Sequence, residues 1–214
     1  FKQKTAYEIG VRLVGSEMCI RDRFEMMFRK TLRISVDRVG ALIGQSGKTK
    51  TWIEQKCRVN LVIDSNTGEV IVSSDNLHSN SLCALDIVQA IAHGFSHVPA
   101  SSLLDENKYL DTIDLKQYCG KSSNSLSRIK SRLIGEKGKA RRVMEETTNT
   151  YISIYGHYVS VIGTPEKIKL VEDAVGILAS GGQHKTAYDL LQRSRTRAKL
   201  DRLQLWEDSP VVEN

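Results

Sequence analysis

The sequence predicts an α+β protein with two tandem copies of one small module, each a three-stranded sheet with helices packed on one face, followed by a C-terminal helix. The main evidence is a repeat with an offset of 91 positions, which aligns residues 42–48 (Leu-Ile-Gly-Gln-Ser-Gly-Lys) with residues 133–139 (Leu-Ile-Gly-Glu-Lys-Gly-Lys). The same offset aligns apolar positions in the helix and the strands that follow each Gly-x-x-Gly turn. At 214 residues, the chain is long enough for two such units.

In the first copy, hydrophobic periodicity and turn residues define the elements. Leu32, Ile34 and Val36 alternate with polar residues, as in a half-buried strand. Asp37 is expected to cap the next helix, and Gly94 is expected to end the last one. That last helix is expected to bury the residues that recur at helical spacing, Leu82, Leu85, Val88 and Ile91. In order, the first copy predicts a strand over residues 32–36, a short helix over 37–43 and the glycine turn over 44–47. A second helix over 48–57, a hairpin over 59–72 and a third helix over 82–93 follow.

The second copy repeats this order and adds a helix. Pro165 is well suited to the first turn of the third helix, and Gly181 and Gly182 are expected to stop it. In order, the elements predicted are a strand over residues 109–115, a helix over 121–132, the glycine turn over 135–138 and a helix over 139–147. Two strands over 151–154 and 158–162, a helix over 165–180 and the C-terminal helix over 183–206 follow.

A Gly-x-x-Gly turn between two helices, followed by a hairpin, is typical of a eukaryotic-type (type I) KH module, whose turn clamps the backbone of single-stranded nucleic acid. Glycine has no Cβ, so a phosphate can approach the main chain closely, and the N–H groups of the next helix point toward it. We therefore expect a first KH module at residues 24–96, a linker at 97–108, a second KH module at 109–182, and a C-terminal helix and tail at 183–214.

The candidate RNA-binding residues are the two turns and the side chains beside them. Those of the second module are Gly135, Glu136, Lys137, Gly138, Lys139, Arg141, Arg142, Arg132 and Ile134. Those of the first module are Gly44, Gln45, Ser46, Gly47, Lys48 and Lys50. The basic side chains would bind phosphates. The central strand of each sheet, residues 59–63 or 151–154, would form the opposite wall and, with Ile43 or Ile134, offer an apolar floor for about four unstacked bases. Because the pair Gln45 and Ser46 is uncharged, the first groove is either an RNA site or a structural turn.

Composition agrees with this interpretation and argues against several others. The net charge of +6 and a pI near 9.1 suit a polyanionic partner without proving one. Glu145 and Glu146 are adjacent, so they point apart on a helix and are interpreted as solvated side chains, not as a catalytic pair. The four cysteines have no Cys-x-x-Cys spacing, which disfavours a zinc site or a redox pair and suits a reducing, cytoplasmic compartment. We expect no catalytic residues, no metal, no cofactor and no membrane span.

Residues 1–23 are excluded from this interpretation. Residues 2–9 and 13–22 resemble the conceptual translation of a sequencing-library adapter, with Gly10 and Val11 where a variable index would lie. The native sequence is therefore expected to be recognisable only from Phe24 onward.

Beyond the module itself, several segments resemble the archaeal tandem-KH proteins of the partner-of-Nob-one (Dim-two-like) family, which are assembly factors of the small ribosomal subunit. The resemblance lies in residues 32–63, 94–96, 111–115, 132–138, 151–156 and 203–207. It covers essentially the whole chain from Phe24 to Trp206. It implies a monomer that binds the single-stranded 3′ end of small-subunit ribosomal RNA, with the second groove as the clearer site.

The same resemblance implies two protein partners, the Nob-one endonuclease that trims this RNA end and the alpha subunit of translation initiation factor two. Two hypotheses follow. The first is a non-catalytic RNA-binding assembly factor, which predicts salt-sensitive binding of a specific single strand. The second is a protein adaptor that recruits a nuclease or an initiation factor, with RNA binding secondary. An RNA-degrading enzyme is disfavoured, because neither paired carboxylates nor metal-ligand spacing occur in the sequence.

Overall fold

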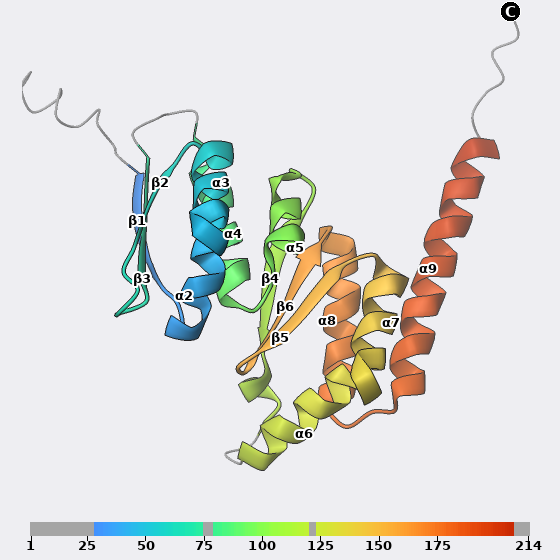
Figure 1. Ribbon diagram of the computed structural model, residues 1–214. Coiled ribbons are helices and arrows are strands. Elements are labelled where there is room, and N and C mark those ends of the chain that lie inside the picture. The colour runs from blue at the N-terminus through green and yellow to red at the C-terminus, as the bar shows by residue number, and fades with distance from the viewer. Residues whose placement is uncertain (1–27, 75–78, 120–122, 208–214) are drawn as a thin grey trace, which may run out of the picture.

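The computed structural model describes residues 28–74, 79–119 and 123–207, with side chains to residue 200. The suspected adapter segment, residues 1–23, lies outside these ranges. The described chain forms two three-stranded sheets, each with helices on one face, and one long helix that extends away from the second sheet (Figure 1). No helix in this part of the chain is long and apolar enough to span a membrane. The predicted α+β architecture is therefore confirmed.

The first unit contains β1 (Phe28–Arg33), α2 (Val36–Ile43), η3 (Gln45–Gly47), α3 (Lys48–Cys57), β2 (Asn60–Ile63), β3 (Glu69–Ser74) and α4 (Ser81–Ala92). Its antiparallel sheet has the order β1-β3-β2, so that Thr31 and Val62 both lie opposite Ile71. Two short helical segments, α5 (His97–Ser101) and η4 (Ser102–Leu104), connect it to the second unit.

The second unit contains β4 (Tyr109–Asp114), η5 (Leu115–Gln117), α6 (Ser123–Ile134), η6 (Glu136–Gly138), α7 (Lys139–Thr148), β5 (Tyr151–Tyr155), β6 (Tyr158–Gly163), α8 (Pro165–Ala179) and α9 (His184–Glu207). Its sheet has the order β4-β6-β5, the same topology as the first. In both sheets the strand that follows the glycine turn and its helix, β2 or β5, is therefore an edge strand. The prediction that it is the central strand is wrong, because β3 and β6 each pair with both other strands of their sheet.

The internal repeat is visible in the two cores. Leu42, Ile53 and Leu61 are fully buried in the first unit. The residues 91 positions later are Leu133 and Met144, which are fully buried, and Ile152, which is 2% exposed. Equivalent positions thus carry equivalent packing, because each copy buries the same helix faces and the same strand face.

Three details differ from the predicted elements. Asp37 does not cap α2, because it lies in the first turn and the N-cap is Ser35, which makes no side-chain cap hydrogen bond. The first strand ends at Arg33, before Val36, which begins α2 and is 55% exposed. The pairing with β3 continues to Ile34, whose N–H donates to the carbonyl of Gly68, the residue before β3. The Arg38 N–H then donates to the Ser35 carbonyl where α2 begins. In α4, Leu82 is 71% exposed, because the buried face is formed by Ser81, Ala84, Ile87, Val88, Ala90 and Ile91.

The end of α4 packs on the open face of the second sheet. Nδ1 of His93 lies 2.8 Å from Oγ of Ser160, and the Ser153 hydroxyl donates to the His93 carbonyl at 2.8 Å. The His93 ring stacks on Tyr158, with ring centroids 4.9 Å apart. Gly94 has φ +100°, and a Cβ there would lie 2.7 Å from Oγ of Ser153. Only glycine fits this contact, in which the end of α4 packs on residues of β5 and β6.

Arg38 ties the same contact to the first unit. Its guanidinium donates to the carbonyls of Ile91 and Phe95, at 2.9 and 2.7 Å, and lies over the Tyr155 ring of the second sheet. Ile162 of β6 is fully buried in the core cluster of the first unit. The interface therefore combines apolar burial with hydrogen bonds whose geometry fixes the two units relative to each other.

Candidate nucleic-acid interface

The two glycine turns have nearly identical backbones. Gly135, Lys137 and Gly138 have φ values of +70°, +50° and +76°, and Gly44, Ser46 and Gly47 have +74°, +53° and +77°. Three left-handed residues within four positions reverse the chain between two helices, which is the sharp turn that the sequence predicts.

The two glycines of each turn have different roles. A Cβ on Gly135 would lie 2.7 Å from Cβ of Ala140 and 2.8 Å from its backbone nitrogen, and a Cβ on Gly44 would lie 2.2 Å from Oγ1 of Thr49. The first glycine therefore lets the turn pack against its own helix. A Cβ on Gly138 or Gly47 would meet nothing within 4 Å. The second glycine thus presents open backbone to solvent, where a phosphate can approach closely.

The helix after each turn begins without a side-chain cap. The N-cap of α7 is Gly138 and that of α3 is Gly47, and neither makes a side-chain cap hydrogen bond. The first N–H groups of a helix have no partner inside the helix, and its N-terminus carries a partial positive charge. Both turns therefore offer an anion the donors that a phosphate requires.

Charge distinguishes the two turns. Lys137, Lys139, Arg141 and Arg142 are all exposed around the second turn, with Glu136 as the acidic side chain of the turn itself. At the first turn, Gln45 and Ser46 are exposed and uncharged, Lys48 is exposed, and Lys50 pairs with Glu54 at 3.8 Å. Because affinity for a nucleic-acid backbone depends on such cations, the second turn is the stronger candidate.

A carboxylate joins the helix after each turn to the edge strand. Oε1 of Glu145 accepts from the Ile152 N–H at 2.9 Å, and Oε1 of Glu54 accepts from the Leu61 N–H at 3.0 Å. Arg141 lies 3.6 Å from Oε2 of Glu145. The interpretation of Glu145 as a purely solvated side chain is therefore wrong, because its carboxylate holds α7 against β5 and fixes the spacing of the two walls.

Apolar side chains lie between these walls. Ile134, at the end of α6, is 39% exposed, and Ile43 is its half-buried counterpart at the end of α2. Ile154 of β5 is partly buried against the second core. The arrangement provides cations at the turn and an apolar surface beside the edge strand, which is what an unstacked single strand needs.

Arg132 lies elsewhere than the other predicted site residues. Its guanidinium donates to the Gly182 carbonyl, and its own carbonyl lies 2.9 Å from Nε2 of His184. Both contacts hold the segment between α8 and α9 against the end of α6. The structure thus gives this arginine a structural partner, whereas Lys137, Lys139, Arg141 and Arg142 surround the turn.

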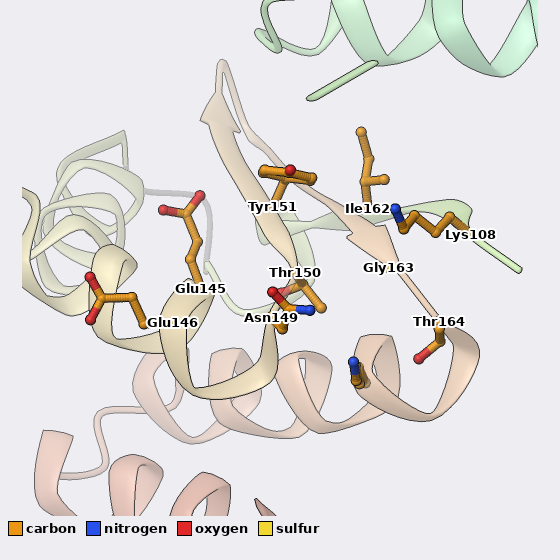
Figure 2. Close-up of a pocket in the computed structure, with 10 residues that line it drawn as sticks. Lys108, Glu145, Glu146, Asn149, Thr150, Tyr151, Ile162, Gly163 and Thr164 are labelled. Atoms are coloured by element: carbon orange, nitrogen blue, oxygen red, sulfur yellow. The ribbon is translucent and has the colours of Figure 1, made fainter. Parts of the chain in front are cut away.

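A cavity that no sequence pattern indicated lies at the other end of α7. It has a volume of about 320 Å³ and is lined by Lys108, Glu145, Glu146, Asn149, Thr150, Tyr151, Ile162, Gly163, Thr164 and Lys167 (Figure 2). The sequence signal that could have pointed to it is Tyr151, a tyrosine at the start of a strand. The sequence does not show that Lys108 and Lys167, from other parts of the chain, line the same cavity. No three His, Cys, Asp or Glu side chains of the described residues are grouped as a metal site would require.

Comparison with known proteins identifies the fold family. Residues 109–196 match the eukaryotic-type KH domain (KH-domain type I), in the form that is the second KH domain of PNO1. The chain is 37% identical over 185 residues to a KH domain-containing protein of Methanocaldococcus jannaschii, covering 85% of this chain and 81% of that protein. It is 31% identical over 116 residues to the pre-rRNA-processing protein pno1 of Schizosaccharomyces pombe, of which it spans about half, 48%.

The solved structures include a Dim2p of Pyrococcus horikoshii in a complex with a/eIF2alpha and rRNA. That Dim2p chain is 35% identical to the present one, with a TM-score of 0.75 over 80% of this chain and 96% of that chain. The family assignment rests on three findings. They are the two units, their glycine turns and the similarity over most of two archaeal proteins. The chain belongs to the partner-of-Nob-one (PNO1) family of tandem KH proteins, together with the archaeal Dim2p.

Proposed function

We propose that this protein is a non-catalytic RNA-binding factor of small-ribosomal-subunit assembly. Its second groove would bind the single-stranded 3′-end region of small-subunit ribosomal RNA and so assist the maturation of that end by a nuclease. The observation that carries the proposal is the second turn, where open backbone at Gly138 and the uncapped start of α7 lie among four exposed cations.

The relatives support the cellular context of this proposal. The fission-yeast relative is a pre-rRNA-processing protein, and the related Dim2p was solved with rRNA and a/eIF2alpha. We extend both to this chain as a proposal, with the Nob-one-type endonuclease and the alpha subunit of translation initiation factor two as protein partners and the chain itself as a monomer.

A fluorescence-anisotropy titration tests the RNA site. The chain from Phe24 onward is titrated against a labelled single-stranded fragment of the archaeal small-subunit rRNA 3′ end and against a shuffled fragment, at two salt concentrations. The test variant is Glu136→Asp with Lys137→Asp, because aspartate tolerates the left-handed backbone of Lys137 and replaces its positive charge by a negative one, which leaves two adjacent negative charges in the turn. The matched control is Gln45→Asp with Ser46→Asp in the first turn.

The proposal predicts that the native fragment binds better than the shuffled one and that the second-turn variant loses at least about tenfold in affinity, since each lost phosphate contact weakens binding and its salt dependence. The first-turn variant reports whether that groove contributes. If the second-turn variant binds as well as the parent protein, the proposal is wrong.

One observation favours the adaptor hypothesis as a second candidate. Large apolar side chains of the first unit and its connection are exposed, with Val62 at 53% and Val98 at 71%, while the first turn has an uncharged central pair. Where exposed apolar residues form a contiguous patch, they favour contact with protein. Calorimetric titration with the purified alpha subunit of initiation factor two separates the candidates, since the adaptor predicts tight protein binding together with weak RNA binding.

A further inference from the structure

The cavity of Figure 2 lies at the far end of the same walls that begin at the second glycine turn. Helix α7 starts directly after the turn and ends at Thr148, beside the cavity residue Asn149. Ten helical residues span about 15 Å. Strand β5, the other wall, begins at the cavity residue Tyr151. Glu145 lines the cavity and bonds to Ile152, so the cavity continues the groove.

The cavity offers three kinds of contact. Tyr151, which is 42% exposed, starts β5 opposite the fully buried Ile162 and gives an aromatic wall (Figure 2). Lys108 and Lys167 supply two ammonium groups. Asn149, Thr164 and Glu146 supply hydrogen-bond donors and acceptors. A nucleotide would use all three kinds of contact: its base would stack on the tyrosine, its phosphate would meet the ammonium groups, and its polar base edges would bond to the polar side chains.

Charge in the cavity is compatible with a phosphate. Glu145 is occupied by the Ile152 N–H and by Arg141, so its negative charge is partly compensated. Lys108 pairs with Asp105 at 3.5 Å, but such exposed pairs are weak and can exchange for a phosphate. A volume of about 320 Å³ lies in the range of small-molecule sites.

The floor of the cavity is held by specific contacts. A Cβ on Gly163 would lie 2.6 Å from Cγ2 of Thr150, so only glycine lets β6 end this close to β5. Oγ1 of Thr150 lies 2.8 Å from Oγ1 of Thr148, and the Thr148 hydroxyl donates to the Met144 carbonyl at 2.7 Å. The floor is therefore tied to the end of α7.

The first unit lacks the residues of this cavity. Ninety-one positions earlier, Asn149, Thr150 and Tyr151 correspond to Arg58, Val59 and Asn60. The aromatic wall is therefore present only in the copy whose turn is also strongly basic.

We propose that this cavity is a subsite for one further nucleotide of the single-stranded RNA, beyond the roughly four that a KH groove holds. Tyr151 stacks on the base, and Lys108 and Lys167 contact its phosphate. The inference rests on the proposed function and extends it from the turn to the other end of α7.

The test is a length series of RNA fragments. Two nested sets taken from the rRNA 3′ end grow from four to seven nucleotides, one set at its 5′ side and one at its 3′ side, each labelled at the opposite end. The test variants are Tyr151→Ala and Lys167→Glu. Their matched controls are Tyr118→Ala, at a tyrosine that is 37% exposed, and Lys169→Glu, on an exposed position of α8. Tyr151→Phe keeps the stacking ring.

For the parent protein, affinity is expected to rise at one length step in one of the two sets. Tyr151→Ala and Lys167→Glu should lose most of that step, about tenfold for the tyrosine, since base–aromatic stacking has this magnitude. Both should bind the four-nucleotide RNA like the parent protein. The two controls and Tyr151→Phe should keep the step.

Several results would overturn the subsite. They are a parent protein with no step in either set, a step that persists in both test variants, or equal weakening of the shortest and longest RNA by a test variant. In each of these cases RNA still binds at the turn, so the proposed function stands. Failure of the parent protein to bind any fragment would reject the proposed function and this subsite together.

Discussion

Oε1 of Glu145 lies 2.9 Å from the backbone nitrogen of Ile152, and 91 positions earlier Glu54 makes the same contact with Leu61 at 3.0 Å. An edge strand exposes N–H groups that would otherwise pair with water or with another strand. In both units a glutamate from the helix after the turn takes one of these donors. The contact holds the helix and the strand at a fixed separation, and this separation sets the width of the groove.

Removal of this carboxylate should weaken the second unit. Glu145→Ala leaves the Ile152 N–H without its protein acceptor and is expected to lower the free energy of unfolding by about 1 kcal/mol. Glu145→Gln keeps an acceptor oxygen and should cost less. Urea denaturation measures both. The matched control is Glu146→Ala at the exposed neighbour, which should change stability by less than about 0.5 kcal/mol. Equal effects at the two positions would show that the contact contributes nothing.

The two glycines of the second turn should respond differently to alanine. Gly135 combines φ +70° and ψ 179° with a Cβ position 2.7 Å from Ala140, so Gly135→Ala is expected to cost about 3 kcal/mol through backbone strain and overlap. Gly138 is left-handed but open, and Gly138→Ala should cost only about 1–2 kcal/mol. Chemical denaturation gives the two values. A reversed order would contradict the packing role assigned to the first glycine.

Acid should weaken the contact between the two units through His93. Burial, and next the nearby His157, lower the pKa of His93 below its usual value. The unfolded chain then binds the proton more tightly, so this contribution to stability is present above the ordinary histidine pKa and is lost as the pH falls toward the folded value. In the tautomer protonated at Nε2, Nδ1 accepts from Ser160, and protonation would remove this acceptor.

His93→Asn tests this prediction, because the amide can still reach Ser160 but does not titrate. Thermal unfolding between pH 7.5 and 5 should show a smaller loss of stability for His93→Asn than for the parent protein. His97→Gln, a change at the histidine that packs edge-on against Trp52, should leave the pH dependence as it is in the parent. If the asparagine variant follows the parent curve, His93 is not the group responsible.

The repeat made the fold predictable from sequence. Two Gly-x-x-Gly turns with matching apolar positions identified the two units and the order of their helices and strands, but not that β2 and β5 lie at the edges of their sheets. Local patterns failed where tertiary contacts decide. Val36 continued the alternation of a strand, but the Arg38 N–H donates to the Ser35 carbonyl, so that α2 begins at Val36. Leu82 fitted a helical stripe, but the face of α4 that contains Ala84, Ile87 and Ile91 packs in the core and leaves Leu82 exposed.

The site shows the same division. The turn and its cations follow one another in the sequence, so the pattern could identify them. The contact of His93 with Ser160 and the cavity lined by Lys108 and Lys167 join residues about 60 positions apart, and no periodicity relates them. Arg132 is the opposite case, a basic residue near the turn in sequence whose head group reaches the connection between α8 and α9.

Arg132 should therefore behave as a structural residue in mutagenesis. Arg132→Met removes the donor to the Gly182 carbonyl and keeps much of the side chain's length, and it is expected to lower the free energy of unfolding by about 1–3 kcal/mol because a partly buried carbonyl loses its partner. Its affinity for the rRNA fragment should fall by less than about twofold under conditions where the variant is folded.

Lys139→Met, at an exposed lysine beside the turn, should show the reverse. It should leave stability unchanged and give weaker, less salt-dependent RNA binding, because it removes a phosphate contact. Urea denaturation and anisotropy titration of the two variants, measured side by side, decide the assignment. A strong loss of RNA affinity in folded Arg132→Met would return this arginine to the binding site.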